Sequence, residues 1–187
     1  AGEMLGTRQS GYIASVGFHL YTRLLSQAVR ELRRANGEHK EIDKEFSKTA
    51  GYIPVSVDLP LSVGIPVSYI PDQSLRLQLY RRMAHIEEVS ELDALIAEFH
   101  DRFGQPVQQV IDLFYQLRVK LLAAGAGLVS ISVEADQIVL RFPTLPSGVQ
   151  SRVLPPIGYQ TRAGRNAYWM KFNPEEGTWR ENLLHVL

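Results

Sequence analysis

Ser90-Glu91-Leu92-Asp93-Ala94-Leu95-Ile96-Ala97-Glu98-Phe99-His100-Asp101-Arg102-Phe103-Gly104 is the segment around which the rest of this chain can be organised. Ser90 and Asp93 have the spacing of a capping box, in which two side chains bond to free amides of a first helical turn. Apolar residues then recur at helical intervals, namely Leu92, Leu95, Ile96, Phe99 and Phe103. Gly104 is a typical helix end. The segment therefore predicts an amphipathic helix with one buried stripe.

Two more helices are expected on either side of this one. The preceding helix follows a cap at Asp72 or Ser74, and its apolar positions are Leu75, Leu79, Met83 and Ile86. The following helix has Pro106 in its first turn, and its apolar positions are Val107, Val110, Ile111, Phe114, Leu117 and Leu121. The pattern predicts three consecutive central helices.

Strand patterns lie before and after these helices. Residues 55–63 alternate apolar and polar side chains, and Pro60 restricts them to an edge strand or a broken one. Residues 129–142 predict a hairpin that turns at 134–137, and residues 159–172 predict a second hairpin that turns at 163–166. A loop over 143–156 joins the hairpins, and a helix over 179–187 closes the chain. Strands grouped apart from helices indicate an α+β fold.

The amino-terminal part has a different character. Residues 14–34 have the apolar spacing of one long amphipathic helix, which ends at Asn36-Gly37. Residues 37–51 are rich in charge and poor in large apolar side chains, which is typical of a linker. We therefore divide the chain into a helical segment (1–36), a linker (37–51) and an α+β domain (52–187).

Composition excludes several classes of function. The 187 residues hold 20 Lys and Arg against 20 Asp and Glu, so no overall positive charge attracts nucleic acid. The absence of cysteine excludes disulfides and thiolate metal sites, and it is compatible with a reducing cytoplasm. No apolar run approaches the roughly 20 residues of a membrane span, and no signal peptide is predicted. We expect a cytoplasmic protein with no membrane partner.

An ordered series of short motifs resembles one protein family. The series comprises Val57-Asp58-Leu59, Ile65-Pro66, Tyr69-Ile70-Pro71-Asp72, Arg76-Leu77, Leu79-Tyr80-Arg81-Arg82, Glu91-Leu92 and Asp101-Arg102-Phe103-Gly104. It is similar to the C-terminal (TRCF) domain of the bacterial transcription-repair coupling factors. The resemblance implies the α+β fold predicted above, and it covers residues 55–121 most strongly.

The first residues carry a second resemblance. The stretch from Gly2 to Gly11 resembles the end of the translocation motif that these factors share with RecG-type branch-migration helicases. Its matching positions are Gly6, Arg8, Gln9 and Gly11. From the residues alone, an exposed glycine-rich loop is the favoured interpretation, and the resemblance reverses that preference. Because the chain opens inside this motif, we expect a fragment of a longer motor protein.

The resemblance implies a regulatory role. In the family, an acidic pair that falls here on Glu98 and Asp101 faces a module resembling the repair protein UvrB. That contact masks the surface that recruits UvrA, and the parent protein also works with RNA polymerase and moves on DNA with ATP and magnesium. The fragment itself is expected to have no catalytic residue, no cofactor and no metal site. On sequence alone, the same acidic row is a solvated helix face.

Two alternatives remain open at this point. The chain could be a nucleic-acid-contacting accessory domain of a RecG-like helicase, and the second hairpin interleaves suitable aromatic and basic residues, namely Tyr159, Arg162, Arg165, Tyr168, Trp169 and Lys171. Inward packing of those aromatic rings is the simpler interpretation. The other alternative is an enzyme fragment that still hydrolyses ATP. The five histidines have no metal-ligand spacing.

Overall fold

The computed structural model describes residues 55–145 and 153–187. The described strands are β1 (Ser56–Asp58), β2 (Ser130–Glu134), β3 (Gln137–Arg141), β4 (Thr161–Ala163) and β5 (Ala167–Lys171). The described helices are α3 (Gln73–Ala84), α4 (Val89–Phe103), α5 (Gln108–Gly125) and α6 (Thr178–Val186). The predicted helix over 14–34, the linker over 37–51 and the translocation motif lie outside these ranges, so the two proposed domain boundaries stay predictions.

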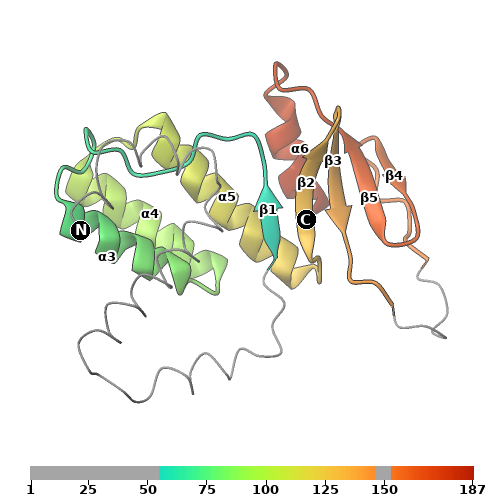
Figure 1. The fold of residues 1–187 in the computed structure, drawn as a ribbon, viewed down its shortest axis with the longest axis horizontal. Coiled ribbons are helices and arrows are strands. Elements are labelled where there is room, and N and C mark those ends of the chain that lie inside the picture. The colour runs from blue at the N-terminus through green and yellow to red at the C-terminus, as the bar shows by residue number, and fades with distance from the viewer. Residues whose placement is uncertain (1–54, 146–152) are drawn as a thin grey trace, which may run out of the picture.

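The five strands form one mixed sheet with the order β1-β2-β3-β5-β4 (Figure 1). β1 pairs with β2 in parallel, whereas the other neighbours are antiparallel. A parallel pair needs a long crossover, and the three helices α3, α4 and α5 supply it. The β2-β3 and β4-β5 pairs are the two predicted hairpins. The α+β fold class is confirmed.

The first strand is shorter than its sequence pattern. Alternation predicts a strand over 55–63, but only Ser56–Asp58 pair with β2. Val57 lies in the core beneath the sheet, whereas Val63 lies in the core between the helices, and Leu61 contacts both cores. The alternating segment 55–63 therefore contributes side chains first to the sheet core and then to the helical core. Pro60 falls just beyond the last paired residue, so its missing N–H removes no ladder bond.

Helix caps decide where α3 and α4 begin. Asp72 caps α3, because its carboxylate accepts from the Leu75 amide at 3.0 Å. The predicted box at Ser90 and Asp93 is wrong. α4 begins at Val89 behind Glu88, and the Glu91 carboxylate accepts from the amides of Glu87 and Glu88 at 2.9 and 3.3 Å. Asp93 instead pairs with Arg118 of α5, which removes it from any cap.

α5 also departs from its prediction. The helix begins at Gln108 behind Val107, so Pro106 precedes the helix and does not lie in its first turn. Val107 and Ile111, both expected in the buried stripe, are each 40% exposed, while the unexpected Leu113 is fully buried. A single apolar stripe was the wrong template for this helix, because α5 packs against two cores on different sides.

Figure 1 shows α5 running from the helical half of the molecule to the sheet half. Val110, Leu113, Phe114 and Leu117 of its first half lie in the helical core with α3 and α4. Val119 and Ala123 of its second half lie in the sheet core with β1, β2, β3, β5 and α6. α5 is therefore the element that holds the two halves together.

Candidate functional site

Only one of the predicted sites lies within the described part of the chain. Gly6, Arg8, Gln9 and Gly11 of the translocation motif lie outside it. Glu98 and Asp101, the predicted interface pair, lie in the last two turns of α4. The site that the family resemblance predicts can therefore be built only around this helix.

Packing determines which side of α4 faces outward. Leu92, Leu95 and Phe99 are fully buried in the helical core, and Phe99 meets Phe114 of α5 edge to face with ring centroids 5.0 Å apart. Because residues three or four apart share a helix face, Glu98 and Asp101 lie together on a different side from this stripe. The core thus fixes the rotation of the helix and presents the two carboxylates outward.

Glu98 is held by two arginines. One carboxylate oxygen accepts from Arg102, one turn further along α4, at 2.6 Å, and the other accepts from Arg82 of α3. The hydrogen bonds from Arg102 and Arg82 hold the pKa of the Glu98 carboxyl below its usual range. Its side chain is 24% exposed. Glu98 is therefore an ionised, oriented carboxylate at the junction of two helices.

Asp101 is in a different state. It is exposed, and within residues 55–145 and 153–187 it has no ion-pair or side-chain hydrogen-bond partner. The predicted pair therefore consists of one carboxylate that is already engaged and one that is available.

Acidic residues are concentrated around the pair, although Arg82 and Arg102 bind Glu98 and Arg118 pairs with Asp93. Residues 87–101 contain six acidic residues and no lysine or arginine: Glu87, Glu88, Glu91, Asp93, Glu98 and Asp101. Backbone hydrogen bonds from Glu87 and Glu88 hold the pKa of Glu91 below its usual range. We call these six residues the acidic α4 segment. Such a segment is suited to contact a basic surface.

In the described ranges, no group of three His, Asp or Glu side chains could hold a metal ion. None of the described helices has the length and apolar character needed to cross a membrane.

A buried polar contact joins α5 to α6, and the sequence did not predict it. Asp112 is almost fully buried and accepts from Arg180 at 2.7 Å and from Gln108 at 2.8 Å. The Tyr115 hydroxyl donates to the Arg180 carbonyl at 3.0 Å, and burial raises its pKa. Gln116, also buried, donates to the Val57 carbonyl at 3.0 Å. Polar residues amid the apolar positions of a helix were the available signal, but their partners lie up to 68 residues away.

The second hairpin divides its aromatic rings between two faces. Tyr168 and Met170 are buried in the sheet core, as inward packing predicts. Trp169 is on the opposite face, where the Arg162 guanidinium lies 4.4 Å from its ring centroid. Tyr159, 47% exposed, is stacked on His185 of α6. The expectation that all aromatic rings of this hairpin turn inward is therefore only partly correct.

Residues 59–149 match the sequence model of the TRCF domain. Residues 59–149 of this chain belong to the TRCF domain family. The chain is 35% identical over 155 residues to the transcription-repair-coupling factor of Mycobacterium tuberculosis, which covers 82% of this chain and 12% of the relative. It is 33% identical over 141 residues to the transcription-repair-coupling factor of Helicobacter pylori, which covers 75% of this chain and 13% of the relative.

The fold agrees with a solved member. A crystal structure of the C-terminal domain of transcription-repair coupling factor superposes with a TM-score of 0.55 and 16% identity, covering 71% of this chain and 89% of that one. This TRCF domain therefore has the fold of that C-terminal domain. The chain spans only about an eighth of the length of the mycobacterial and Helicobacter relatives.

Proposed function

We propose that this chain is the C-terminal regulatory part of an ATP-dependent DNA translocase that couples transcription to nucleotide excision repair. In this proposal the acidic α4 segment docks on the UvrB-like module of the same parent protein and masks the surface that recruits UvrA. The observation that carries the proposal is the run of six acidic residues over 87–101, in which Asp101 is exposed and has no ion-pair partner among the described residues. The match of residues 59–149 to the TRCF domain supports the proposal that this contact forms within a transcription-repair coupling factor.

The two carboxylates have different parts in the proposed docking. Asp101 is the direct contact, because no ion pair within the described residues has to be broken before it meets a basic side chain. Glu98 already receives Arg82 and Arg102 on separate oxygens, but each carboxylate oxygen has a second lone pair and can accept another donor. The ion pairs with Glu98 also partly neutralise Arg82 and Arg102, which reduces the repulsion between these two arginines and an approaching cation.

The energy of such a contact suits a switch. Partly exposed ion pairs contribute about 0.2–1 kcal/mol each, so a few of them give a weak association between separate molecules. Within one parent chain the two partners are at high effective concentration, and weak contacts then suffice to hold a closed state. A contact of this strength can also open when the motor engages RNA polymerase and DNA.

We further propose that the fragment performs no turnover. The Walker lysine and the acidic magnesium ligand of the motor belong to parts of the parent protein that precede this domain, and ATP and magnesium would bind there. An ATPase assay of the purified chain with duplex DNA is expected to give no hydrolysis above a protein-free blank. Measurable, DNA-stimulated hydrolysis would favour the enzyme-fragment alternative.

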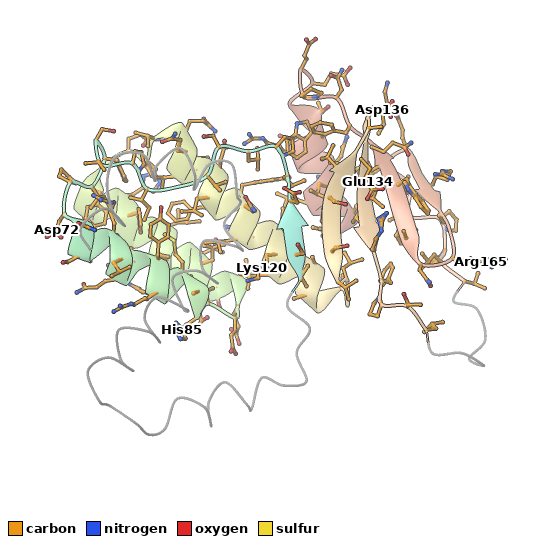
Figure 2. The ribbon with its side chains drawn as sticks, viewed as in Figure 1. Asp72, His85, Lys120, Glu134, Asp136 and Arg165 are labelled. Atoms are coloured by element: carbon orange, nitrogen blue, oxygen red, sulfur yellow. The ribbon has the colours of Figure 1, made fainter. Side chains whose placement is uncertain are left out.

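The docking itself is tested with the recombinant UvrB-like module of the parent protein, titrated against the chain by isothermal calorimetry at 50 and 300 mM salt. Asp101→Arg removes an attraction and adds a repulsion, and we expect at least a fivefold loss of affinity at low salt. Asp136→Arg is the matched control, since Figure 2 shows Asp136 on the β2-β3 turn, in the other half of the molecule. Equal affinities of the wild type and Asp101→Arg would overturn the proposal, as would an absence of binding at 50 mM salt.

A further inference from the structure

The sheet half contains a positively charged region that the proposed docking does not use. Residues 137–145 and 153–174, which the structure describes, hold four basic residues and no acidic one: Arg141, Arg162, Arg165 and Lys171. Arg141 is paired with Glu134 at 2.9 Å, whereas Arg162, Arg165 and Lys171 have no ion-pair partner in the part of the chain that the structure describes. The neutral total charge of the chain hides this region, and a local positive surface attracts polyanions.

An aromatic platform lies within this region. Arg162 of β4 and Trp169 of β5 are directly opposite in the ladder, and the guanidinium lies 4.4 Å from the ring centroid. A Cβ added to Gly164 would come within 2.4 Å of the indole, so the ring lies against the β4 backbone at that glycine. Arg162 is exposed and Trp169 is half-buried. Indole rings and guanidinium planes are the surfaces on which unpaired bases stack.

A second aromatic ring, that of Tyr159, lies in the turn that precedes β4. Tyr159 and Gln160 have φ of +51° and +53° after Gly158 at +77°, and the Thr161 amide closes this left-handed turn on the Gly158 carbonyl at 2.9 Å. Left-handed backbone at residues other than glycine is costly, and such strain is concentrated at functional sites. Here the turn displays Tyr159 parallel to the His185 ring, with centroids 5.4 Å apart.

A shallow cavity of about 290 Å³ connects this turn to the sheet and to α6. Its lining includes Tyr159, Gln160, Lys171, Glu176, Trp179 and Asn182. These side chains offer two rings, two carboxamides, an ammonium group and a carboxylate; the carboxamides can bind a base edge, whereas the carboxylate disfavours a phosphate inside the cavity. The cavity thus lies beside both the strained turn and the positive region.

We propose that the β4-β5 hairpin binds single-stranded nucleic acid. Trp169 with Arg162, and Tyr159, stack on bases, while Arg165 and Lys171 contact phosphates; Figure 2 shows Arg165 at the tip of the hairpin, directed away from the molecule. A single strand is favoured over a duplex, because base faces are accessible only where the bases are unpaired. This surface is separate from the acidic α4 segment, so the two proposals stand or fall independently.

The test uses a fluorescein-labelled 15-nucleotide oligo-dT and the complete 187-residue chain, with fluorescence anisotropy as the measure of binding. Two phosphate contacts predict a salt slope of about −1.4, so affinity should fall about sevenfold between 50 and 200 mM salt. Tryptophan emission gives an independent readout with unlabelled oligo-dT. Trp179 is 6% exposed, so stacking should quench mainly Trp169, and Trp169→Phe should remove most of the quenching while retaining most of the affinity.

Single substitutions separate stacking from charge. Trp169→Ala is expected to weaken binding about tenfold. Lys171→Gln and Arg165→Gln should each lower the affinity a few-fold and reduce the salt slope by about 0.7, whereas Arg81→Gln on α3 removes the same charge and should change neither. Circular dichroism verifies that each variant is folded, and Arg162→Gln substitutes for Trp169→Ala if the latter is not.

Several outcomes would overturn the inference. They are the absence of binding at 50 mM salt, equal or tighter binding of a 15-base-pair duplex, and binding without quenching of tryptophan emission. A polyglutamate of the same charge that displaces oligo-dT completely, while itself quenching emission to the same extent, would assign the surface to acidic proteins and also overturn it. Salt-dependent binding with quenching that depends on Trp169 supports it.

Discussion

The two halves of this domain carry opposite local charge although the chain as a whole is neutral. In the helical half, residues 87–101 hold six acidic residues and no lysine or arginine; in the sheet half, residues 137–145 and 153–174 hold four basic residues and no acidic one. The comparison teaches that net charge is a poor guide to the partners of a small domain. Attraction depends on charge within about 10 Å, the screening length at moderate salt, so each half acts on its own surroundings.

The two halves differ in charge but are joined by one shared helix. α5 contributes side chains to both cores, and Asp112, Tyr115 and Gln116 connect it to α6 and β1. We therefore expect one cooperative unfolding unit with two separate interaction surfaces. Each of the following predictions either breaks that unit or sharpens the contrast between the halves.

The largest effect is expected in the helical core. Phe99→Ala removes a fully buried ring that meets both Phe103 and Phe114, and should cost about 3–5 kcal/mol of unfolding free energy. Both tryptophans lie in the sheet half, so their emission reports unfolding at a distance from the mutation. In urea titrations, emission and far-ultraviolet circular dichroism should shift together. An unchanged emission midpoint would show that the halves unfold independently. Val67→Ala, at a side chain 57% exposed, is the control.

The next effect concerns the contact between the halves. Asp112→Ala leaves the Arg180 guanidinium, 31% exposed, without its counter-charge, and should cost about 2–4 kcal/mol. Asp101→Asn, at an exposed carboxylate, should change stability by less than about 0.5 kcal/mol. Urea denaturation compares the two. Similar small effects of both substitutions would remove Asp112 as the polar link between α5 and α6.

A smaller effect is expected in the basic half. Gly164→Ala places a methyl group against the Trp169 ring and should cost about 1–3 kcal/mol as the indole moves away from the β4 backbone. Tryptophan emission of the folded protein should shift at the same time. A methyl group added at Gly125 meets no atom within 4 Å, so Gly125→Ala should be neutral or slightly stabilising. An unaltered emission spectrum for Gly164→Ala would contradict the described ring position.

The smallest effect is a pH dependence in the acidic half. The pKa of Glu98 is lowered on folding, so its stabilising contribution is present above the ordinary value of 4.5 and is lost as pH falls through the folded pKa. The difference in unfolding free energy between wild type and Glu98→Gln should be roughly 0.2–1 kcal/mol per ion pair at pH 7 and should shrink progressively as pH falls below 4.5. Chemical denaturation at several pH values measures it. Asp136→Asn is the control, and a difference that grows on acidification would contradict the assignment.

Local signals in the sequence were reliable where one residue acts on its near neighbours. Asp72 as a cap, Gly104 as a helix end, Pro60 at a strand end and both hairpin turns all depend on contacts within a few residues. The predicted cap of α4 at Ser90 and Asp93 was wrong. Glu88 and Glu91 cap the helix instead, and Asp93 forms an ion pair with Arg118. The prediction of a single buried stripe on α5 was wrong, because this helix packs against two cores and has more than one buried face.

The sequence alone determined the α+β class, the order of the elements, the outward acidic row of α4 and the resemblance to the TRCF family, because helical and strand periodicity and ordered motifs are properties of nearby residues. Tertiary structure alone decided that Glu98 is held by two arginines while Asp101 is left available. It also decided that Asp112 finds Arg180 and that Trp169 and Tyr168 turn to opposite faces. These contacts depend on which distant segments of the chain are brought together by α5 and the sheet, and the spacing of residues along the sequence does not predict them.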